Sequence, residues 1–335
     1  MSNRPPRDDE ETRRQASAKL TAHRGLATWG ERLVPLGEFR DAAARAGRRL
    51  SSAERAAAAE HHRRPAYDDT PVEGPFERIV VFGGVYNNHH GLAALLEQTA
   101  PLQPGAIYCL GDLGGFGPNP HKVRPLLEQG GVLGVQGNYE ESLAAGREDC
   151  NCGYTDPRDN EFADLSYRYT AERTTPQMRR WLGSWPLRRR VRLGGRELLL
   201  VHGSPRRINE FLFASTSPER FLEVLCDEQR CDGFLCTHTG LPWHRRLPSG
   251  RDVVNVGVIG RPANDGATHV WYAVLEAAAD GLRVRLETLD YDHQALAREM
   301  RAEELPEEFI ETILTGWWTT CLEILPAKER AASRF

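Results

Sequence analysis

The sequence predicts an α/β protein, a β-sandwich flanked by helices, with helical extensions at both ends. Two observations predict this class. Between residues 76 and 290, apolar runs of strand length alternate with helical patterns, as is typical of layered α/β folds. Polar residues directly follow several of these runs, and open α/β sheets place their sites at the carboxyl ends of strands. We divide the chain into an extension (1–75), a central domain (76–290) and a tail (291–335).

The extension is rich in Arg, Ala and Glu and has few large apolar side chains. Ser51-Ser52-Ala53-Glu54 is a good helix start, which alanines continue to residue 59. We expect a polar, helical and partly disordered segment, with the first dozen residues disordered. Its larger apolar residues have helical or turn spacing and are expected to pack on the central domain: Leu26, Trp29, Leu33, Leu36 and Phe39.

The central domain alternates strands with helices. In chain order, the apolar runs predict strands at 79–82, 106–110, 132–135, 197–201, 233–236, 253–256 and 270–275, and helices at 91–96 and 120–127. Gly194-Gly195, between two such runs, predicts a hairpin turn. The polar, Tyr-rich segment 147–173 is expected to carry a helix over the site.

The tail is acidic, with apolar residues at helical spacing, among them Leu296, Met300, Phe309 and Ile313. An apolar face this strong must cover either the chain's own domain or another chain. Packing within the protomer is the simpler interpretation, and a homo-oligomer formed through the C-terminal helix is the alternative.

Composition excludes several classes of protein. A net charge of −4 over 335 residues argues against a general nucleic-acid-binding surface. No stretch approaches the roughly 20 apolar residues of a membrane span, and the N-terminus lacks the apolar segment of a signal peptide. We therefore expect a cytoplasmic protein. Seven scattered cysteines favour free thiols, although Cys150 and Cys152, in a polar loop, remain open.

Four potential metal ligands follow predicted strands. They are Asp112, Asn138, His202 and His238. One carboxylate, one amide and two imidazoles form a mixed oxygen and nitrogen set, which suits Mn²⁺, Fe²⁺ or Zn²⁺ and excludes a metal that needs soft thiolates. We expect these residues to hold a divalent metal.

The surrounding motifs resemble the calcineurin-like metallophosphoesterase superfamily, in particular its bacterial phosphodiesterase-like branch. Residues 111–120, Gly-Asp-Leu-Gly-Gly-Phe-Gly-Pro-Asn-Pro, are similar to the G-D-x-x-G-x-G-P-x-P form of that branch. Residues 255–262 resemble its N-x-G-S-V-G-x-P stretch, with Val258 in place of Ser. The resemblance covers the central domain and implies a two-metal centre built from loops that follow the strands of an α/β sandwich.

The resemblance also implies that one metal set is complete and the other is not. All four ligands of the second metal correspond to the residues named above. Three of the four ligands of the first metal are replaced, at Gly84, Tyr86 and Gly240. Because decay at random would not spare one whole set, we expect the remaining site to be used, with one metal per chain.

A second metal remains open, because other residues could rebuild the first site. A Tyr86 phenolate can ligate a ferric ion, and His89 or His90 could bend back to assist. His244, six residues after His238, could reach the place vacated at Gly240.

Several residues are candidates for catalysis. Tyr139 stands where the family has its catalytic His and could protonate the leaving oxygen, although a phenol is a weak acid. Glu140 could orient a neighbour or cap a helix. Arg206 and Arg207, with Arg261 in a later loop, could replace the charge of the missing metal.

Two functions follow as hypotheses. We favour an enzyme, a phosphoesterase that hydrolyses a small phosphomonoester or phosphodiester with metal-activated water at an altered, mononuclear centre. The alternative is an inactive relative that binds a phosphorylated ligand or a protein partner, because fold does not fix function. A weaker hypothesis makes the tail an interaction module.

Overall fold

The computed structural model describes residues 26–29, 32–35, 70–279 and 281–332. The chain forms two compact units, residues 1–66 and 67–335. In the first, strands β1 (Leu26–Trp29) and β2 (Arg32–Pro35) pair antiparallel. Helical or turn spacing was expected here, but Thr28 and Val34 are β-branched and favour strands. The helix expected from Ser51 and the disorder expected in the first dozen residues lie outside the described residues.

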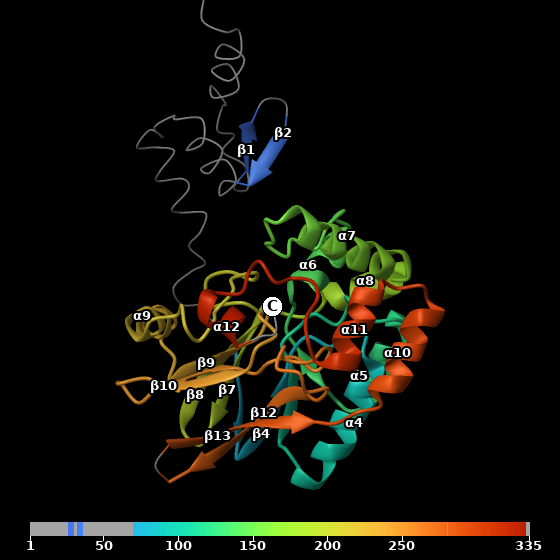
Figure 1. The fold of residues 1–335 in the computed structure, drawn as a ribbon. Coiled ribbons are helices and arrows are strands. Elements are labelled where there is room, and N and C mark those ends of the chain that lie inside the picture. Colours follow the sequence, from blue (N-terminus) through green and yellow to red (C-terminus); the bar gives the residue numbers. More distant parts are fainter. Residues whose placement is uncertain (1–25, 30–31, 36–69, 280, 333–335) are drawn as a thin grey trace, which may run out of the picture. The chain divides into compact units, whose positions relative to one another are not determined.

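The second unit contains two sheets (Figure 1). The six-stranded sheet has the order β10-β11-β9-β8-β7-β3, with β3 (Val72–Phe76), β7 (Arg188–Leu193), β8 (Arg196–Val201), β9 (Gly233–Cys236), β10 (Trp243–Arg246) and β11 (Asp252–Asn255). The five-stranded sheet has the order β13-β12-β4-β5-β6, with β4 (Arg78–Phe82), β5 (Ala106–Cys109), β6 (Leu133–Gly134), β12 (Val270–Ala278) and β13 (Gly281–Leu289). The expected hairpin is confirmed, because β7 and β8 pair antiparallel around Gly194-Gly195.

Helices flank these sheets. They are α4 (His89–Thr99), α5 (Val123–Gln129), α6 (Asn138–Ala145), α7 (Pro157–Glu172), α8 (Pro176–Gly183), α9 (Glu219–Gln229), α10 (His293–Ala302), α11 (Glu307–Thr315) and α12 (Ala327–Ala331), with short 3₁₀ helices at Ala100–Leu102 and Pro120–Lys122. Helices α4, α5 and α10 lie on one side of the molecule and α9 on the other (Figure 1). None of the helices in the described ranges has both the length and the apolar character to cross a membrane.

The clusters of buried apolar side chains show that the second unit has four layers. Ile79 and Val81 of β4 face the other sheet, whereas Val80 and Phe82 pack in a separate cluster with helix residues such as Leu92. Successive strand residues point to opposite faces, so β4 is buried on both sides, which explains its continuous apolar run. Helix α9 covers the outer face of the six-stranded sheet. The predicted fold class, a β-sandwich flanked by helices, is confirmed.

The tail packs on the chain's own domain. Its apolar residues form one cluster with Phe116 and Phe162: Leu296, Ala297, Met300, Leu305, Phe309, Ile310 and Ile313. Trp318 is fully buried, and its indole N–H donates to the carbonyl of Pro262 at 2.7 Å. Packing within the protomer is therefore confirmed, and the homo-oligomer stays a prediction.

Candidate metal centre

The four expected metal ligands come from both sheets. Asp112 lies in the loop after β5, and Asn138 is the first residue of α6, which follows β6. His202 directly follows β8, and His238 lies two residues after β9. Each sheet contributes two side chains, and all four are buried, with exposed fractions between 0% and 7%.

The structure brings these four side chains together. The Nε2 atom of His202 lies 3.0 Å from Nδ1 of His238 and 3.1 Å from Oδ1 of Asn138. The same nitrogen lies 3.3 Å from Oδ2 of Asp112. The ligand atoms of Asp112, His202 and His238 all lie within 4.8 Å of one another. The spacing is that of one metal site.

Hydrogen bonds to neighbouring carbonyl groups orient His202 and Asn138 so that one acceptor atom of each faces the site. Nδ1 of His202 lies 2.6 Å from the carbonyl of Leu110 and is assigned as the protonated nitrogen, since a carbonyl can only accept. In the neutral ring, Nε2 then carries a lone pair. The amide of Asn138 donates from Nδ2 to the carbonyl of Cys150 at 2.9 Å, which leaves Oδ1 for the site. Oδ2 of Asp112, Oδ1 of Asn138 and Nε2 of a neutral His202 are then acceptors that face one another, which fits a divalent cation.

The pKa shifts of the two histidines and of Asp112 are also consistent with a metal site. Burial and the neighbouring His202 lower the pKa of His238 to about 3, so this imidazole stays neutral. Burial alone would lower the pKa of His202, but the Asp112 carboxylate outweighs it and raises the pKa. Burial would raise the pKa of Asp112, yet the charge and hydrogen bond of His202 hold it below its usual value. A proton on His202 and a metal ion therefore compete for the same lone pair.

Glu140 holds the loop that carries Asp112. Its buried carboxylate accepts backbone N–H groups from Asp112 and Leu113, both at 2.8 Å, and from Gly137 at 2.7 Å. These bonds occupy the carboxylate at the start of α6, as expected for a capping and orienting residue. We therefore assign Glu140 to positioning rather than to proton transfer.

Gly137 makes room for the ligands. A Cβ atom at this position would lie 2.4 Å from Oδ1 of Asp112 and 2.9 Å from Nδ1 of His202. Both distances are too short for a carbon in contact, so a side chain here would displace two of the four ligands. The glycine before Asn138 is thus a steric requirement of the site.

Tyr139 does not lie where a catalytic acid would be useful. Its hydroxyl is 2.9 Å from Oγ of Ser166 in α7, and its ring packs edge-on against Tyr167 in the core. Burial raises the pKa of Tyr139 well above its usual value. The expectation of a proton donor is not supported, because the backbone at the start of α6 turns this side chain into the core.

Replacing Tyr139 with phenylalanine should consequently leave phosphoester hydrolysis unchanged. It should lower the free energy of unfolding by about 1 kcal/mol through loss of one buried hydrogen bond. Initial rates and urea unfolding of both proteins measure the two effects. A loss of rate without a loss of stability would restore Tyr139 to the mechanism.

Side chains fill the region expected to hold the first metal. A Cβ atom on Gly84 would lie 2.4 Å from Cγ1 of Val258 and 2.9 Å from Cζ of Tyr86. On the other side, Nη2 of Arg261 lies 3.6 Å from where the Cβ of Gly240 would be. An aspartate at position 84 would not fit without displacing Val258 or Tyr86.

The histidines considered for rebuilding the first site lie elsewhere. His89 and His90 point to Glu299 of α10. Nε2 of His244 lies 2.8 Å from Oδ1 of Asp252 on the neighbouring strand. Burial raises the pKa of the Tyr86 hydroxyl, so a phenolate is disfavoured. Nothing in the described residues completes a second set of ligands around Tyr86.

The arginines separate into two groups. Arg206 pairs with Glu210 through Nε at 2.8 Å and lies over the ring of Phe221, and Arg207 is exposed. No contact of the described residues joins either side chain to the four candidate ligands, so the role expected for them from their proximity to His202 stays a prediction. Arg261 is only 4% exposed, and its guanidinium carbon lies 3.6 Å from the ring centroid of Trp318.

The loop at residues 150–152 was not predicted to support the site. Cys150 and Cys152, the two cysteines left open by the sequence, form a disulfide, whereas the five others are free thiols, as expected. The carbonyl of Cys150 orients Asn138, as described above. Phe211 also escaped sequence reasoning, although its ring stacks on His238 at 4.3 Å. Neither residue belongs to a motif, so only the tertiary structure identifies them.

Comparison with known proteins agrees with this geometry. Residues 77–272, more than half of the chain, match the family described as calcineurin-like phosphoesterase. The chain belongs to this family. A calcineurin-like phosphoesterase is a metal-dependent hydrolase of phosphoester bonds, and the convergent buried ligands are consistent with that class.

Similar proteins cover most of the same region. An uncharacterized protein of Methanocaldococcus jannaschii is 22% identical over 71% of this chain and 98% of its own length. The crystal structures of a metallophosphoesterase from Sphaerobacter thermophilus and a hypothetical protein from Pyrococcus horikoshii share 23% and 22% identity, with TM-scores of 0.56 and 0.60. Each covers 72% of this chain and 99% of the other. These likenesses show a shared fold.

Proposed function

We propose that this calcineurin-like phosphoesterase hydrolyses a small phosphomonoester or phosphodiester at a mononuclear centre. The observation that carries the proposal is the convergence of Asp112, Asn138, His202 and His238 on one buried point. A divalent ion there would lower the pKa of a bound water molecule towards about 7 and polarise a phosphoryl oxygen. The crowding around Gly84 supports one ion rather than two.

Arg261 supports a phosphorylated substrate. No carboxylate of the described residues forms an ion pair with this buried guanidinium, and its Nε atom has no hydrogen-bond partner there. A buried cation without an anion is costly, whereas a phosphate oxygen would offset that cost. Arg261 also lies beside Gly240, in the region expected for the first metal. Arg261 would therefore stabilise the negative charge of the phosphate, as a second metal ion would otherwise do.

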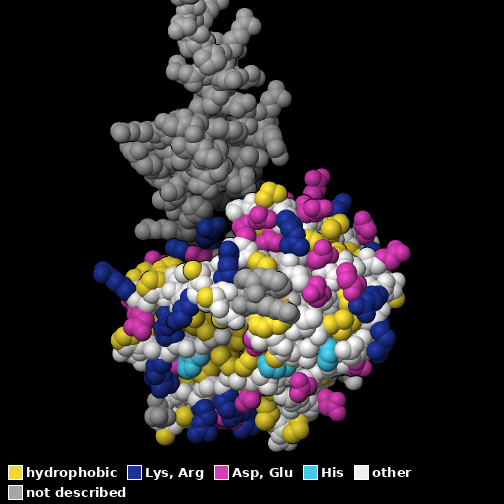
Figure 2. Space-filling model, in the orientation of Figure 1, with side chains coloured by type: hydrophobic (Ala, Val, Ile, Leu, Met, Phe, Trp, Pro, Cys, Tyr) yellow, Lys and Arg dark blue, Asp and Glu magenta, His cyan; other side chains and the backbone are white. Residues whose placement is uncertain are grey.

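The enclosure of the centre supports a small substrate. The four ligands are buried, and the ring of Phe211 stacks on His238. Acidic and basic side chains are interspersed on the face shown in Figure 2, which is consistent with no general affinity for nucleic acid. Small phosphorylated molecules are therefore the partners we expect.

Binding without turnover is the second candidate, and one observation favours it. By the motif resemblance, Tyr139 stands in place of the family's catalytic histidine, and its hydroxyl lies 2.9 Å from Oγ of Ser166 in the core. A phosphorylated ligand could then rest on Arg261 without a group to protonate its leaving oxygen. This alternative predicts ligand binding by calorimetry with no product formed.

The deciding experiment combines metal analysis with hydrolysis. The purified full-length chain, supplied with Mn²⁺, Fe²⁺ or Zn²⁺, is assayed with bis(p-nitrophenyl) phosphate and p-nitrophenyl phosphate. Metal-dependent release of nitrophenol supports the enzyme. Binding of inorganic phosphate without hydrolysis of either compound would favour the binding protein.

Replacing Arg261 with methionine should lower kcat/KM about 100- to 1,000-fold, the usual effect of removing a group that stabilises transition-state charge. The free energy of unfolding should change by less than about 2 kcal/mol, because loss of the stacking on Trp318 is offset by removal of a buried charge that has no ion-pair partner among the described residues. Steady-state kinetics and thermal unfolding measure the two effects. Arg180→Met, at an exposed position of α8, is the matched control. Equal kinetics in both variants would exclude Arg261 from the site.

A further inference from the structure

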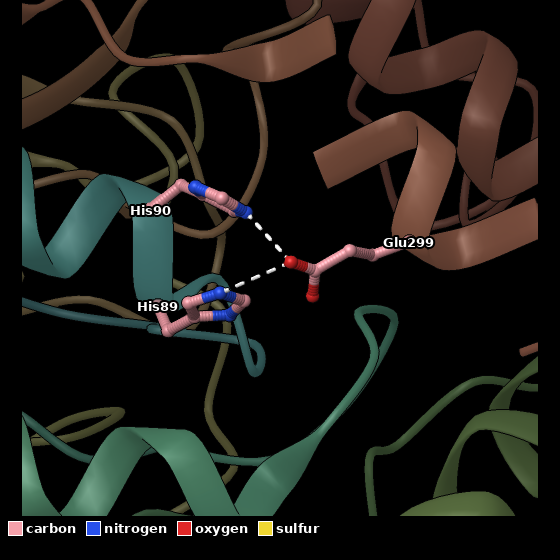
Figure 3. A group of neighbouring side chains, drawn as sticks. All are labelled: His89, His90 and Glu299. Atoms are coloured by element: carbon pink, nitrogen blue, oxygen red, sulfur yellow. Dashed lines mark hydrogen bonds and ion pairs between the residues drawn. The ribbon is translucent and has the colours of Figure 1, made fainter. Parts of the chain in front are cut away.

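A second group of possible metal ligands lies where the tail meets the central domain. His89 and His90 are the first two residues of α4, and Glu299 lies in α10. Figure 3 shows both imidazoles pointing to the same carboxylate oxygen. Nε2 of His90 lies 3.1 Å from Oε1 of Glu299, and Nε2 of His89 lies 3.4 Å from it. The three ligand atoms lie within 4.8 Å of one another.

These separations are those of ligands around one small cation. With zinc bonds of about 2.0 to 2.1 Å and tetrahedral angles, two ligand atoms stand about 3.4 Å apart. The two distances from the imidazole nitrogens to Oε1 of Glu299, 3.1 and 3.4 Å, therefore need little adjustment. The two nitrogens lie within 4.8 Å of each other. Two imidazoles and one carboxylate are also a ligand set that zinc accepts, with water in the fourth position.

The surroundings hold the carboxylate in place and leave the site accessible. The other oxygen of Glu299 accepts Nδ2 of Asn119 at 2.8 Å and Nζ of Lys122 at 3.0 Å. These two bonds orient Oε1 towards the histidines, as partners of metal-ligating carboxylates do. The side chains of His89, His90 and Glu299 are 14%, 23% and 27% exposed, so an ion and a water molecule can reach them.

We propose that His89, His90 and Glu299 form a separate zinc site that joins helix α10 of the tail to the start of α4. The site lies outside the set of Asp112, His202 and His238, and it needs none of those residues. Its role is structural, because zinc bound only to the folded chain stabilises the docking of the tail. The proposal does not rest on the function proposed above.

The test measures zinc per chain, by elemental mass spectrometry after equilibration with Zn²⁺ and gel filtration. It uses the full-length chain in two backgrounds, wild type and His202→Ala, so that ions at the two sites are counted separately. His90→Gln should remove one zinc ion per chain in both backgrounds. His121→Gln, at an exposed histidine of the neighbouring 3₁₀ helix, should remove none.

A thermal measurement gives a second readout. In the His202→Ala background, zinc at about 100 times its dissociation constant should raise Tm by about 5 to 10 °C. His90→Gln should abolish this rise, and circular dichroism checks that the variant is folded. Glu299→Gln must behave like His90→Gln.

Equal zinc content in the His90→Gln and His121→Gln proteins, in both backgrounds, would overturn the proposal and leave the cluster as hydrogen bonds only. If the central site binds no zinc, each protein with an intact His202 will contain one zinc ion fewer. The difference in zinc content between the His90→Gln and His121→Gln proteins will stay the same. Failure of the proposed function is thus distinguishable.

Discussion

Replacing His202 with alanine should remove the bound metal and the hydrolytic activity together. Nε2 of His202 lies at the centre of the four ligands, within 3.3 Å of each of the other three. Changes in residues that only support a ligand already cost about 10- to 100-fold in metal affinity. Loss of the ligand itself should therefore cost more than about 100-fold. Calorimetric titration with Mn²⁺ or Zn²⁺ and assays with a nitrophenyl phosphate measure the loss.

The matched control is His121→Ala, an exposed histidine outside the site. Stability must be followed as well, because His202→Ala leaves the carbonyl of Leu110 without its donor. An unsatisfied buried acceptor lowers the free energy of unfolding by about 1 to 3 kcal/mol. We expect the variant to remain folded. Full activity in a folded His202→Ala protein would remove the whole centre from the mechanism.

Replacing Glu140 with alanine should destabilise the protein strongly, by about 3 to 5 kcal/mol. The change leaves three buried backbone N–H groups without an acceptor, those of Asp112, Leu113 and Gly137. Each costs about 1 to 3 kcal/mol when unsatisfied, and neighbouring losses are only partly additive. Urea unfolding of the metal-free protein measures the effect, and metal affinity should fall with it because the Asp112 loop loosens.

Glu141→Ala is the control for this prediction. Glu141 is the next residue of α6, and its carboxylate pairs with a largely exposed Arg147 at 3.2 Å. Such surface pairs contribute about 0 to 1 kcal/mol. Similar unfolding curves for the two variants would show that the hydrogen bonds of Glu140 do not hold the loop.

Strand and helix placement was largely predictable from the sequence. The runs at 79–82, 106–110 and 233–236 correspond to β4, β5 and β9, because strands buried on both faces are continuously apolar. Strand β10, Trp-His-Arg-Arg, was missed since it carries no such pattern. Strand β3 was missed too, and the sheet consequently begins at Val72, before the expected boundary at residue 76.

The candidate site was predictable in part. Asp112, Asn138, His202 and His238 were identifiable because their motifs place ligands at strand ends, where open sheets bring them together. Tyr139, Arg206 and Arg207 were chosen from closeness in sequence to such ligands. In the structure Tyr139 contacts Ser166 and Arg206 pairs with Glu210, because closeness in sequence does not fix where a side chain points.

The sequence by itself determined the family, the layered α/β class and the four candidate metal ligands, since these depend on local motifs and on the periodicity of apolar residues. Only the tertiary structure decided that Val258 and Tyr86 fill the space beside Gly84, that the buried Arg261 lies beside Gly240, and that Glu299 contacts His89. These facts join residues far apart in the chain. They depend on how packed layers bring side chains within a few ångströms, which no local pattern encodes.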